Sequence, residues 1–221
     1  MMLKRKEKTG EIPSLGMYVN VPFCSTTCDF CAFYQQKPSK KGFDEFFLGL
    51  EREFDRFPSD RFFSTVFIGG GTPGLLSAEQ LERLCLIIKS AGLTDSCEWT
   101  VEVAPSEISS QKLEVLGAGG VNRISLGVQT FSPEMMQALG RKHDVEKVFS
   151  AYAMIREAAA FDVNLDLIFG APGQTIEMWD SDLRQAAALE PEHLSTYCLT
   201  FEEDTAMFVR LSEGKIQLDV E

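Results

Sequence analysis

The chain has 221 residues, and its 33 acidic and 21 basic side chains give a formal net charge of −12. This acidity argues against a nucleic-acid partner or an anionic membrane surface, because both are bound through clustered Lys and Arg. No run approaches the ~20 apolar residues of a transmembrane helix, and no apolar stretch follows the basic start as in a secretory signal. We therefore expect a cytoplasmic protein without a transmembrane segment.

Strand-like and helix-like segments alternate along the chain. Short runs rich in Val, Ile, Leu, Phe and Tyr indicate strands, which we place at Met17–Val21, Thr65–Ile68, Trp99–Val103, Arg123–Val128, Asn164–Ile168 and Leu194–Leu199. Amphipathic runs between them indicate helices, which we place at Phe43–Phe57, Ser77–Ser90, Ser110–Leu116, Asp144–Ala160 and Thr175–Leu189.

This alternation predicts right-handed βαβ units and parallel strands, hence an α/β fold. A complete eight-unit barrel needs ~250 residues, so we expect a partial, TIM-like (β/α)6 barrel, with an open doubly wound sheet as the alternative. We place an N-terminal tail at 1–16 and the core domain at 17–205. At 206–221 we expect the start of a linker to a C-terminal domain that this sequence lacks. In either architecture, ligands bind beyond the carboxyl ends of the strands.

The strongest chemical signal is a group of three cysteines just after the first predicted strand. Cys24, Cys28 and Cys31 have the spacing C-x3-C-x2-C. Four cysteines usually hold a [4Fe–4S] cluster, so three leave one iron open to a small molecule. Structural zinc needs four N or S ligands, and a zinc or redox-cysteine site remains the alternative. The other cysteines, Cys85, Cys97 and Cys198, are interpreted as packing residues in a helix, a loop and a strand respectively.

Two further groups lie near strand ends. The run Gly69–Pro73 closes the second strand, and its glycines permit close backbone approach, so its N–H groups either grip a charged ligand or form a tight turn. Glu102 and Asp166 sit among apolar residues near the ends of later strands. A carboxylate inside a barrel is costly unless it is paired. These two are therefore either members of buried ion pairs or part of a ligand site.

Together these motifs resemble the radical S-adenosylmethionine (SAM) superfamily, in its oxygen-independent coproporphyrinogen III oxidase-like branch. The matching segments occur in order at Tyr18–Cys24, Val66–Ser77, Val121–Phe131, Asn164–Gly170 and His193–Tyr197. The resemblance implies that the amino and carboxylate groups of SAM bind the open iron of the cluster. It also implies that an electron from the reduced cluster cleaves SAM to a 5′-deoxyadenosyl radical.

The resemblance also assigns individual residues to the SAM site. It implies that Phe30 contacts the adenine end and that the run Gly70, Gly71 and Thr72 binds the SAM amino group. It implies further contacts to the ribose, amino-acid or adenine parts of SAM from Tyr18, Glu102, Gln129, Arg141 and Asp166. Arg141 follows the branch pattern L-G-R-x-H, which spans Leu139–His143 here.

Within this branch, the chain could be one of two kinds of protein, an oxidase or a heme chaperone. The oxidases decarboxylate propionates of a porphyrinogen and carry a further cysteine two residues after the third, where this chain has Phe33. Heme chaperones of the HemW type carry C-x-x-C-D-F, which Cys28–Phe33 resembles. We favour the chaperone, with SAM, heme and heme-accepting proteins as partners. The heme-binding H-N-x-x-Y-W motif of the chaperones is not in this chain, whose only histidines are His143 and His193. A cluster-bearing binding module without radical chemistry is a third hypothesis.

Overall fold

The computed structural model describes residues 15–57, 61–141 and 144–216. The strands are β1 (Leu15–Val21), β2 (Phe63–Gly70), β3 (Leu93–Val103), β4 (Arg123–Gln129), β5 (Asp162–Phe169) and β6 (His193–Cys198). The helices are α1 (Lys40–Phe54), α2 (Ala78–Ser90), α3 (Ser110–Ala118), α4 (Pro133–Ala138), α5 (Val145–Ala158), α6 (Ile176–Ala188) and α7 (Ala206–Ser212).

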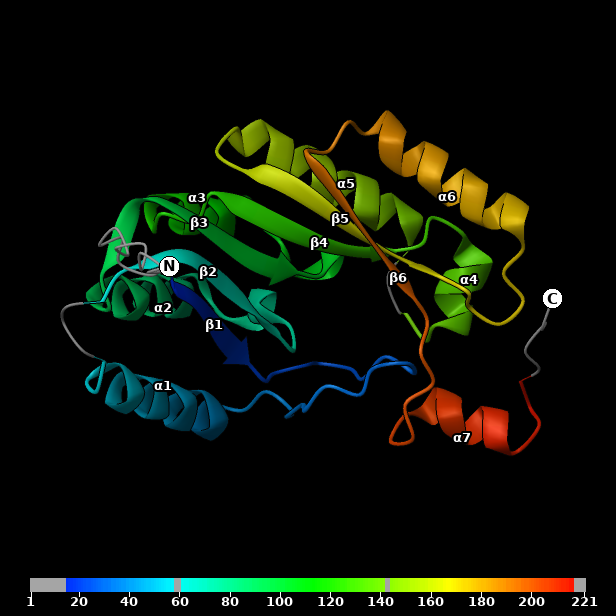
Figure 1. Cartoon of the computed structure of the whole chain (residues 1–221), viewed down its shortest axis with the longest axis horizontal. Helices are drawn as coiled ribbons and strands as arrows, with labels where there is room; N and C mark the ends of the chain where they lie inside the picture. Colours follow the sequence, from blue (N-terminus) through cyan, green and yellow to red (C-terminus); the bar gives the residue numbers. More distant parts are fainter. Residues whose placement is uncertain (1–14, 58–60, 142–143, 217–221) are drawn as a thin grey trace, which may run out of the picture.

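The strands form one parallel sheet in the order β1-β2-β3-β4-β5-β6 (Figure 1). A doubly wound sheet reverses its strand order at a switch point, whereas this order follows the chain throughout. The partial barrel is therefore confirmed, and the doubly wound alternative is wrong. Among the described residues, no helix is both long enough and apolar enough to cross a membrane.

Two short helices, α4 and α7, were not expected from the sequence. Each begins after a hydroxyl side chain that caps it, because Ser132 Oγ accepts from Met135 N and Thr205 Oγ1 accepts from Phe208 N. Helix α7 lies within the segment 206–221 that we interpret as the start of a linker. That domain boundary stays a prediction, since a packed helix can begin a linker or end a domain.

Strand β3 begins at Leu93, earlier than the predicted start at Trp99. Phe63 pairs with Leu93 but Thr65 pairs with Glu98, so the register shifts and the intervening residues bulge. Cys97, which we expected in a loop, therefore lies inside this irregular strand. The polar residues of the bulge hid its strand character from the sequence pattern.

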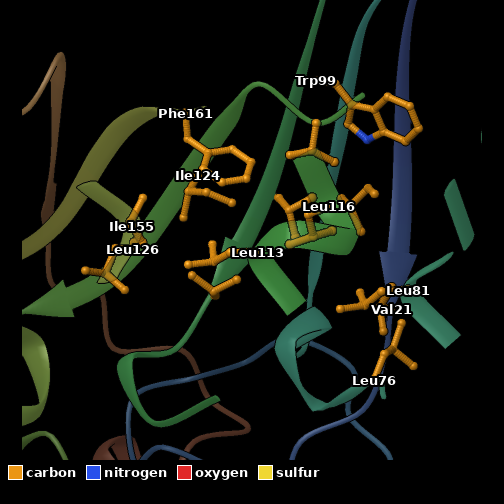
Figure 2. Packing of buried hydrophobic residues seen from close by; sticks show 14 of the residues in the cluster. Val21, Leu76, Leu81, Trp99, Leu113, Leu116, Ile124, Leu126, Ile155 and Phe161 are labelled. Atoms are coloured by element: carbon orange, nitrogen blue, oxygen red, sulfur yellow. The ribbon is translucent and has the colours of Figure 1, made fainter. Parts of the chain in front are cut away.

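The main hydrophobic cluster lies between the sheet and the helices that cover it. Alternate strand residues supply it, such as Val163, Leu165 and Leu167 of β5, all fully buried. Figure 2 shows its centre, where Leu113 and Leu116 of α3 lie near Ile124 of β4. Burying one such side chain stabilises the fold by roughly 1.5–3 kcal/mol. This cluster therefore fixes the strands and, through them, the side chains on the opposite face of the sheet.

A second, smaller hydrophobic cluster lies at the carboxyl ends of the strands. Its buried members come from α4 and its end, the end of β5, and the segment around α7: Met135, Leu139, Ile168, Ala171, Leu199 and Met207. Phe30 of the cysteine loop packs against it. The cysteine loop, α4 and α7 therefore share one small core, although they are far apart in sequence (Figure 1).

Candidate functional site

A cavity of about 1180 Å³ opens at the carboxyl ends of the strands, between the cysteine loop and the ends of β2 to β6. Most of the predicted site residues line it: Cys24, Cys28, Phe30, Cys31, Gly70, Gly71, Thr72, Glu102, Gln129, Arg141 and Asp166. Tyr18 does not line this cavity. It is 58% exposed and stacks on Phe67 of β2, with ring centroids 5.9 Å apart. The fold thus brings together residues from four strands and the cysteine loop that the sequence shows only as separate motifs.

The three cysteines of the loop are free thiols, and each sulfur has a hydrogen-bond partner outside the cysteine motif. The sulfur-to-partner distances are 3.4 Å from Cys24 to Thr72 Oγ1, 3.7 Å from Cys28 to Arg141 Nη1 and 2.9 Å from Cys31 to Gln35 Nε2. Burial raises the pKa of the Cys24 and Cys28 thiols, while the Arg141 guanidinium opposes that rise. Burial therefore outweighs these contacts in the metal-free protein, but each of the three sulfurs has a nearby polar partner that could stabilise the thiolate, which is the form that binds metal.

The cysteine loop is held in place through Asp29. Asp29 N donates to Leu139 O at 3.3 Å, and Asp29 O accepts from Met207 N at 2.8 Å. The Asp29 carboxylate forms an ion pair with Arg210 of α7. Gly140 adopts φ +69°, and a Cβ there would lie 2.5 Å from the Asp29 carboxyl carbon. The end of α4 and the first turn of α7 thus fix the middle of the loop from two sides.

The glycine run is explained mainly by close packing. A Cβ on Gly69 would lie 2.5 Å from Glu102 Oε2, and one on Gly71 would lie 2.6 Å from Phe23 O. The N–H groups of Gly70, Gly71 and Thr72 all donate within the protein, to Glu102 Oε2, Val21 O and Phe23 O. The expectation that these N–H groups grip a ligand is therefore wrong, because the protein itself satisfies them. Binding of the SAM amino group by this run stays a prediction, since a cationic amino group needs acceptors rather than donors.

Two carboxylates stand in the cavity wall without a cationic partner. Among the described residues, no ion pair involves Glu102 or Asp166. Burial, and then the nearby Asp166, raise the pKa of Glu102 to about 7. Burial also raises the pKa of Asp166, although Ser125 Oγ and Asn164 Nδ2 donate to its carboxylate at 2.7 and 2.8 Å. The buried-ion-pair alternative therefore has no support here, and the pair is suited to a cationic ligand.

Gln129 and Arg141 complete the wall beside the cysteines. The register shifts between Gly127 and Gln129, and Gln129 adopts φ +70°, which is uncommon for a side chain of this type. Arg141 Nη2 donates to Gly127 O at 3.0 Å, whereas its buried Nε has no partner. The bulge thus places Gln129 beside Arg141, one of whose guanidinium donors is buried without a partner.

Sequence reasoning missed Asp182, a buried carboxylate of α6. Its two oxygens accept from Thr130 Oγ1 and Phe131 N, both at 2.7 Å. These bonds hold the residues that directly follow Gln129 and so support its unusual backbone. The available signal was position, because Asp182 occupies the apolar stripe of its helix between Trp179 and Ala186.

The donor set of the cavity suits an iron–sulfur cluster better than a single metal ion. Within the part of the chain that the structure describes, no group of His, Cys, Asp and Glu side chains is arranged to hold a single metal ion. In a cluster each thiolate binds its own iron, so the sulfurs need not meet at one point. Besides Arg141 Nε, a second buried polar atom at this site, Gln35 Oε1, lacks a partner. Three thiols, two unpaired carboxylates and unused polar atoms around one cavity fit a cluster with a cationic ligand beside it.

Sequence comparison supports the same conclusion. The sequence profile of the radical SAM superfamily matches residues 18–186, which is more than half of the chain. The chain belongs to the radical SAM superfamily. The cofactors of this superfamily are a [4Fe–4S] cluster and SAM, and the cavity of this radical SAM domain has residues that suit both.

The similar proteins include both heme chaperones and a coproporphyrinogen III oxidase. The domain is 35% identical to heme chaperone HemW of Bacillus subtilis over 91% of this chain and 54% of the relative. It is 37% identical to HemW of Lactococcus lactis over 92% of this chain and 54% of the relative. The solved radical SAM enzyme coproporphyrinogen III oxidase (HemN) of Escherichia coli superposes with a TM-score of 0.80 at 32% identity, over 92% of this chain and 47% of HemN. The chain spans about half the length of the curated relatives it matches.

The remaining candidate residues are the histidines and the cysteines outside the three-cysteine motif. His143 lies outside the described residues. His193 starts β6, where its Nδ1 bonds Asn164 Oδ1. Cys85 is buried, as expected for a packing residue, but for Cys198 that interpretation is wrong because its side chain is exposed and lines the cavity. A cysteine at the end of an edge strand has no neighbouring strand to cover it.

Proposed function

We propose that Cys24, Cys28 and Cys31 bind a [4Fe–4S] cluster and that the adjoining cavity binds SAM. The observation that carries this proposal is the arrangement of three free thiols, each with a hydrogen-bond partner, at one end of a cavity with two carboxylates that lack ion pairs. When bound, a reduced cluster supplies the electron that cleaves SAM.

The chain's own residues would orient SAM against the cluster. Glu102 and Asp166 offer negative charge to the cationic groups of SAM, and Asp166 is held in one orientation by Ser125 and Asn164. Arg141 lines the cavity, and its guanidinium suits a carboxylate. Phe30 lines the cavity and packs against the second hydrophobic cluster, so one ring face can support the adenine.

The favoured biological function is that of a HemW-like heme chaperone: the whole protein carries heme in the cytoplasm and delivers it to heme-accepting proteins. Two observations support this choice over the oxidase. The relatives named HemW are 35% and 37% identical to this chain. Phe33, 71% exposed, lines the cavity at the position where the oxidases carry a further cysteine. An exposed aromatic ring can stack on a flat apolar ligand, whereas a cysteine at this position would be suited to binding metal.

Electron paramagnetic resonance tests the cluster and SAM proposal. Anaerobically reconstituted, dithionite-reduced protein should give a reduced [4Fe–4S] signal that changes when SAM is added. The triple variant Cys24→Ala/Cys28→Ala/Cys31→Ala should fold but lose iron, sulfide and SAM binding. Cys97→Ala is the matched control, since this cysteine lies away from the cavity in β3 and should leave the signal unchanged. A signal indifferent to SAM would reject the SAM site, and no cluster at all would reject the whole proposal.

The chaperone is tested against its alternatives by products and ligands. A chaperone should bind heme in an absorption titration and leave coproporphyrinogen unchanged. The oxidase alternative, supported by the TM-score of 0.80 against HemN, requires conversion of coproporphyrinogen with formation of 5′-deoxyadenosine. A binding module without radical chemistry would form no 5′-deoxyadenosine under any reducing condition. Conversion of the porphyrinogen would overturn the chaperone assignment.

A further inference from the structure

Gln35 contacts a cluster cysteine but has no place in the SAM site described above. Its Nε2 donates to Cys31 Sγ at 2.9 Å, and its side chain lines the cavity. The backbone of the next residue is fixed, because Cys24 N donates to Gln36 O at 3.1 Å and Gln36 N donates to Pro22 O at 2.7 Å. Gln35 is therefore held beside Cys31 by the same loop that carries the cysteines.

The orientation of the Gln35 amide follows from the chemistry of its partner. A metal-bound thiolate only accepts hydrogen bonds, so the NH2 group must face Cys31 and the oxygen must face away. In that orientation Oε1 is buried and has no partner among the described residues. An unsatisfied buried acceptor lowers the stability of the fold. The contact to sulfur is thus kept although it lowers the stability of the fold, which points to a functional reason.

Hydrogen bonds to the sulfurs are one of the means by which a protein sets the reduction potential of an iron–sulfur cluster. A reduced cluster carries one more negative charge, so an N–H donor at a ligand sulfur stabilises the reduced form more than the oxidised form. Thr72 and Arg141 contact the other two sulfurs, but the superfamily resemblance also places both at SAM. Gln35 is the partner whose contact to sulfur can be altered without changing a SAM residue.

We propose that Gln35 raises the reduction potential of the cluster by donating a hydrogen bond to Cys31. Gln35 acts through the cysteine, so it is a positioning residue rather than a catalytic one. The inference rests on the proposed cluster site, and iron and sulfide content reports on that site separately.

Two substitutions and one matched control test this proposal in the intact chain. Gln35→Leu keeps the bulk of the side chain and removes the donor, and Gln35→Glu keeps the shape but adds negative charge. Gln36→Leu makes the same chemical change one residue later, where the amide donates to Tyr34 OH at 2.6 Å and contacts no sulfur. Redox titration followed by electron paramagnetic resonance gives the midpoint potential of each reconstituted protein.

The expected order of potentials is wild type and Gln36→Leu highest, Gln35→Leu lower, and Gln35→Glu lowest, with iron and sulfide content unchanged. Equal potentials in wild type and Gln35→Leu, both with full clusters, would overturn the proposal.

If the Gln35 variants fail to hold a cluster, the wild-type protein still decides the question. Pulsed resonance on reduced protein labelled with ¹⁵N-glutamine should detect one coupled amide nitrogen, and its absence would overturn the proposal as well. A wild-type chain without iron would instead reject the cluster site itself.

Discussion

The two hydrophobic clusters of this domain differ in what builds them and in what depends on them. The main cluster is formed by alternate residues of all but the last strand and by the helices packed on the sheet. The second cluster joins a loop, two short helices and strand ends around Phe30, Leu139 and Met207. The first holds the barrel together, whereas the second holds the cysteine loop on the barrel. Stability and function should therefore respond differently to substitutions in the two places.

The largest effect is expected from a substitution in the main cluster, which should lower the stability of the whole domain. Leu126→Ala removes a fully buried side chain of β4, and such changes cost about 2–5 kcal/mol because a cavity remains. Urea unfolding followed by circular dichroism should show a lower midpoint with an unchanged slope. Iron bound per folded molecule should stay at the wild-type level. A selective loss of iron at full stability would contradict the proposed division between the clusters.

The next effect concerns the polar face of the sheet, between the two clusters. The pKa of Glu102 is raised to about 7, so in this range the folded state holds a proton that the unfolded state releases. The stabilising contribution is present below the ordinary pKa of glutamate and is lost as the pH rises through 7. The full shift corresponds to about 3 kcal/mol. Glu102→Gln cannot titrate and should gain that amount over wild type between pH 4.5 and pH 8.

Urea unfolding of the cluster-free protein at pH 5 and pH 8 measures this difference. Glu134→Gln, which changes an exposed glutamate of α4, is the control and should show no such trend. If Glu102→Gln differs from wild type equally at both pH values, the raised pKa is wrong. SAM should oppose the effect, because a cationic ligand favours the ionised carboxylate.

The contrast between the clusters also explains which parts of the fold and of the candidate site could be predicted from the sequence. The main cluster follows regular periods of two and 3.6 residues, so the strands and most helices were predictable from the pattern of apolar residues. The position of Cys24, Cys28 and Cys31 together at the cavity was predictable because their spacing is local. Asp182 and the Arg210–Asp29 ion pair were not, because each joins segments far apart in the chain. Helix α7 was missed because seven residues carry too little periodic signal.

The smallest expected effect on stability gives the sharpest test of the comparison. The Arg210–Asp29 ion pair is about one-third exposed on each side, so Arg210→Gln should cost less than about 1 kcal/mol of stability. The same pair nevertheless fixes α7 to the middle of the cysteine loop. Arg210→Gln should therefore release iron to a chelator faster than wild type, with the difference shrinking at high salt.

Arg184→Gln is the matched control for this prediction. It removes an ion pair with Asp180 on the exposed face of α6, so it should cost equally little stability and leave iron release unchanged. Chelation followed by absorbance, together with urea unfolding of all three proteins, separates the two quantities. Equal iron release from Arg210→Gln and Arg184→Gln would show that α7 does not hold the loop. Faster release from Arg210→Gln alone would show that an interaction of little value to the fold can still control the site, because the second cluster is small and each of its contacts acts directly on the cysteine loop.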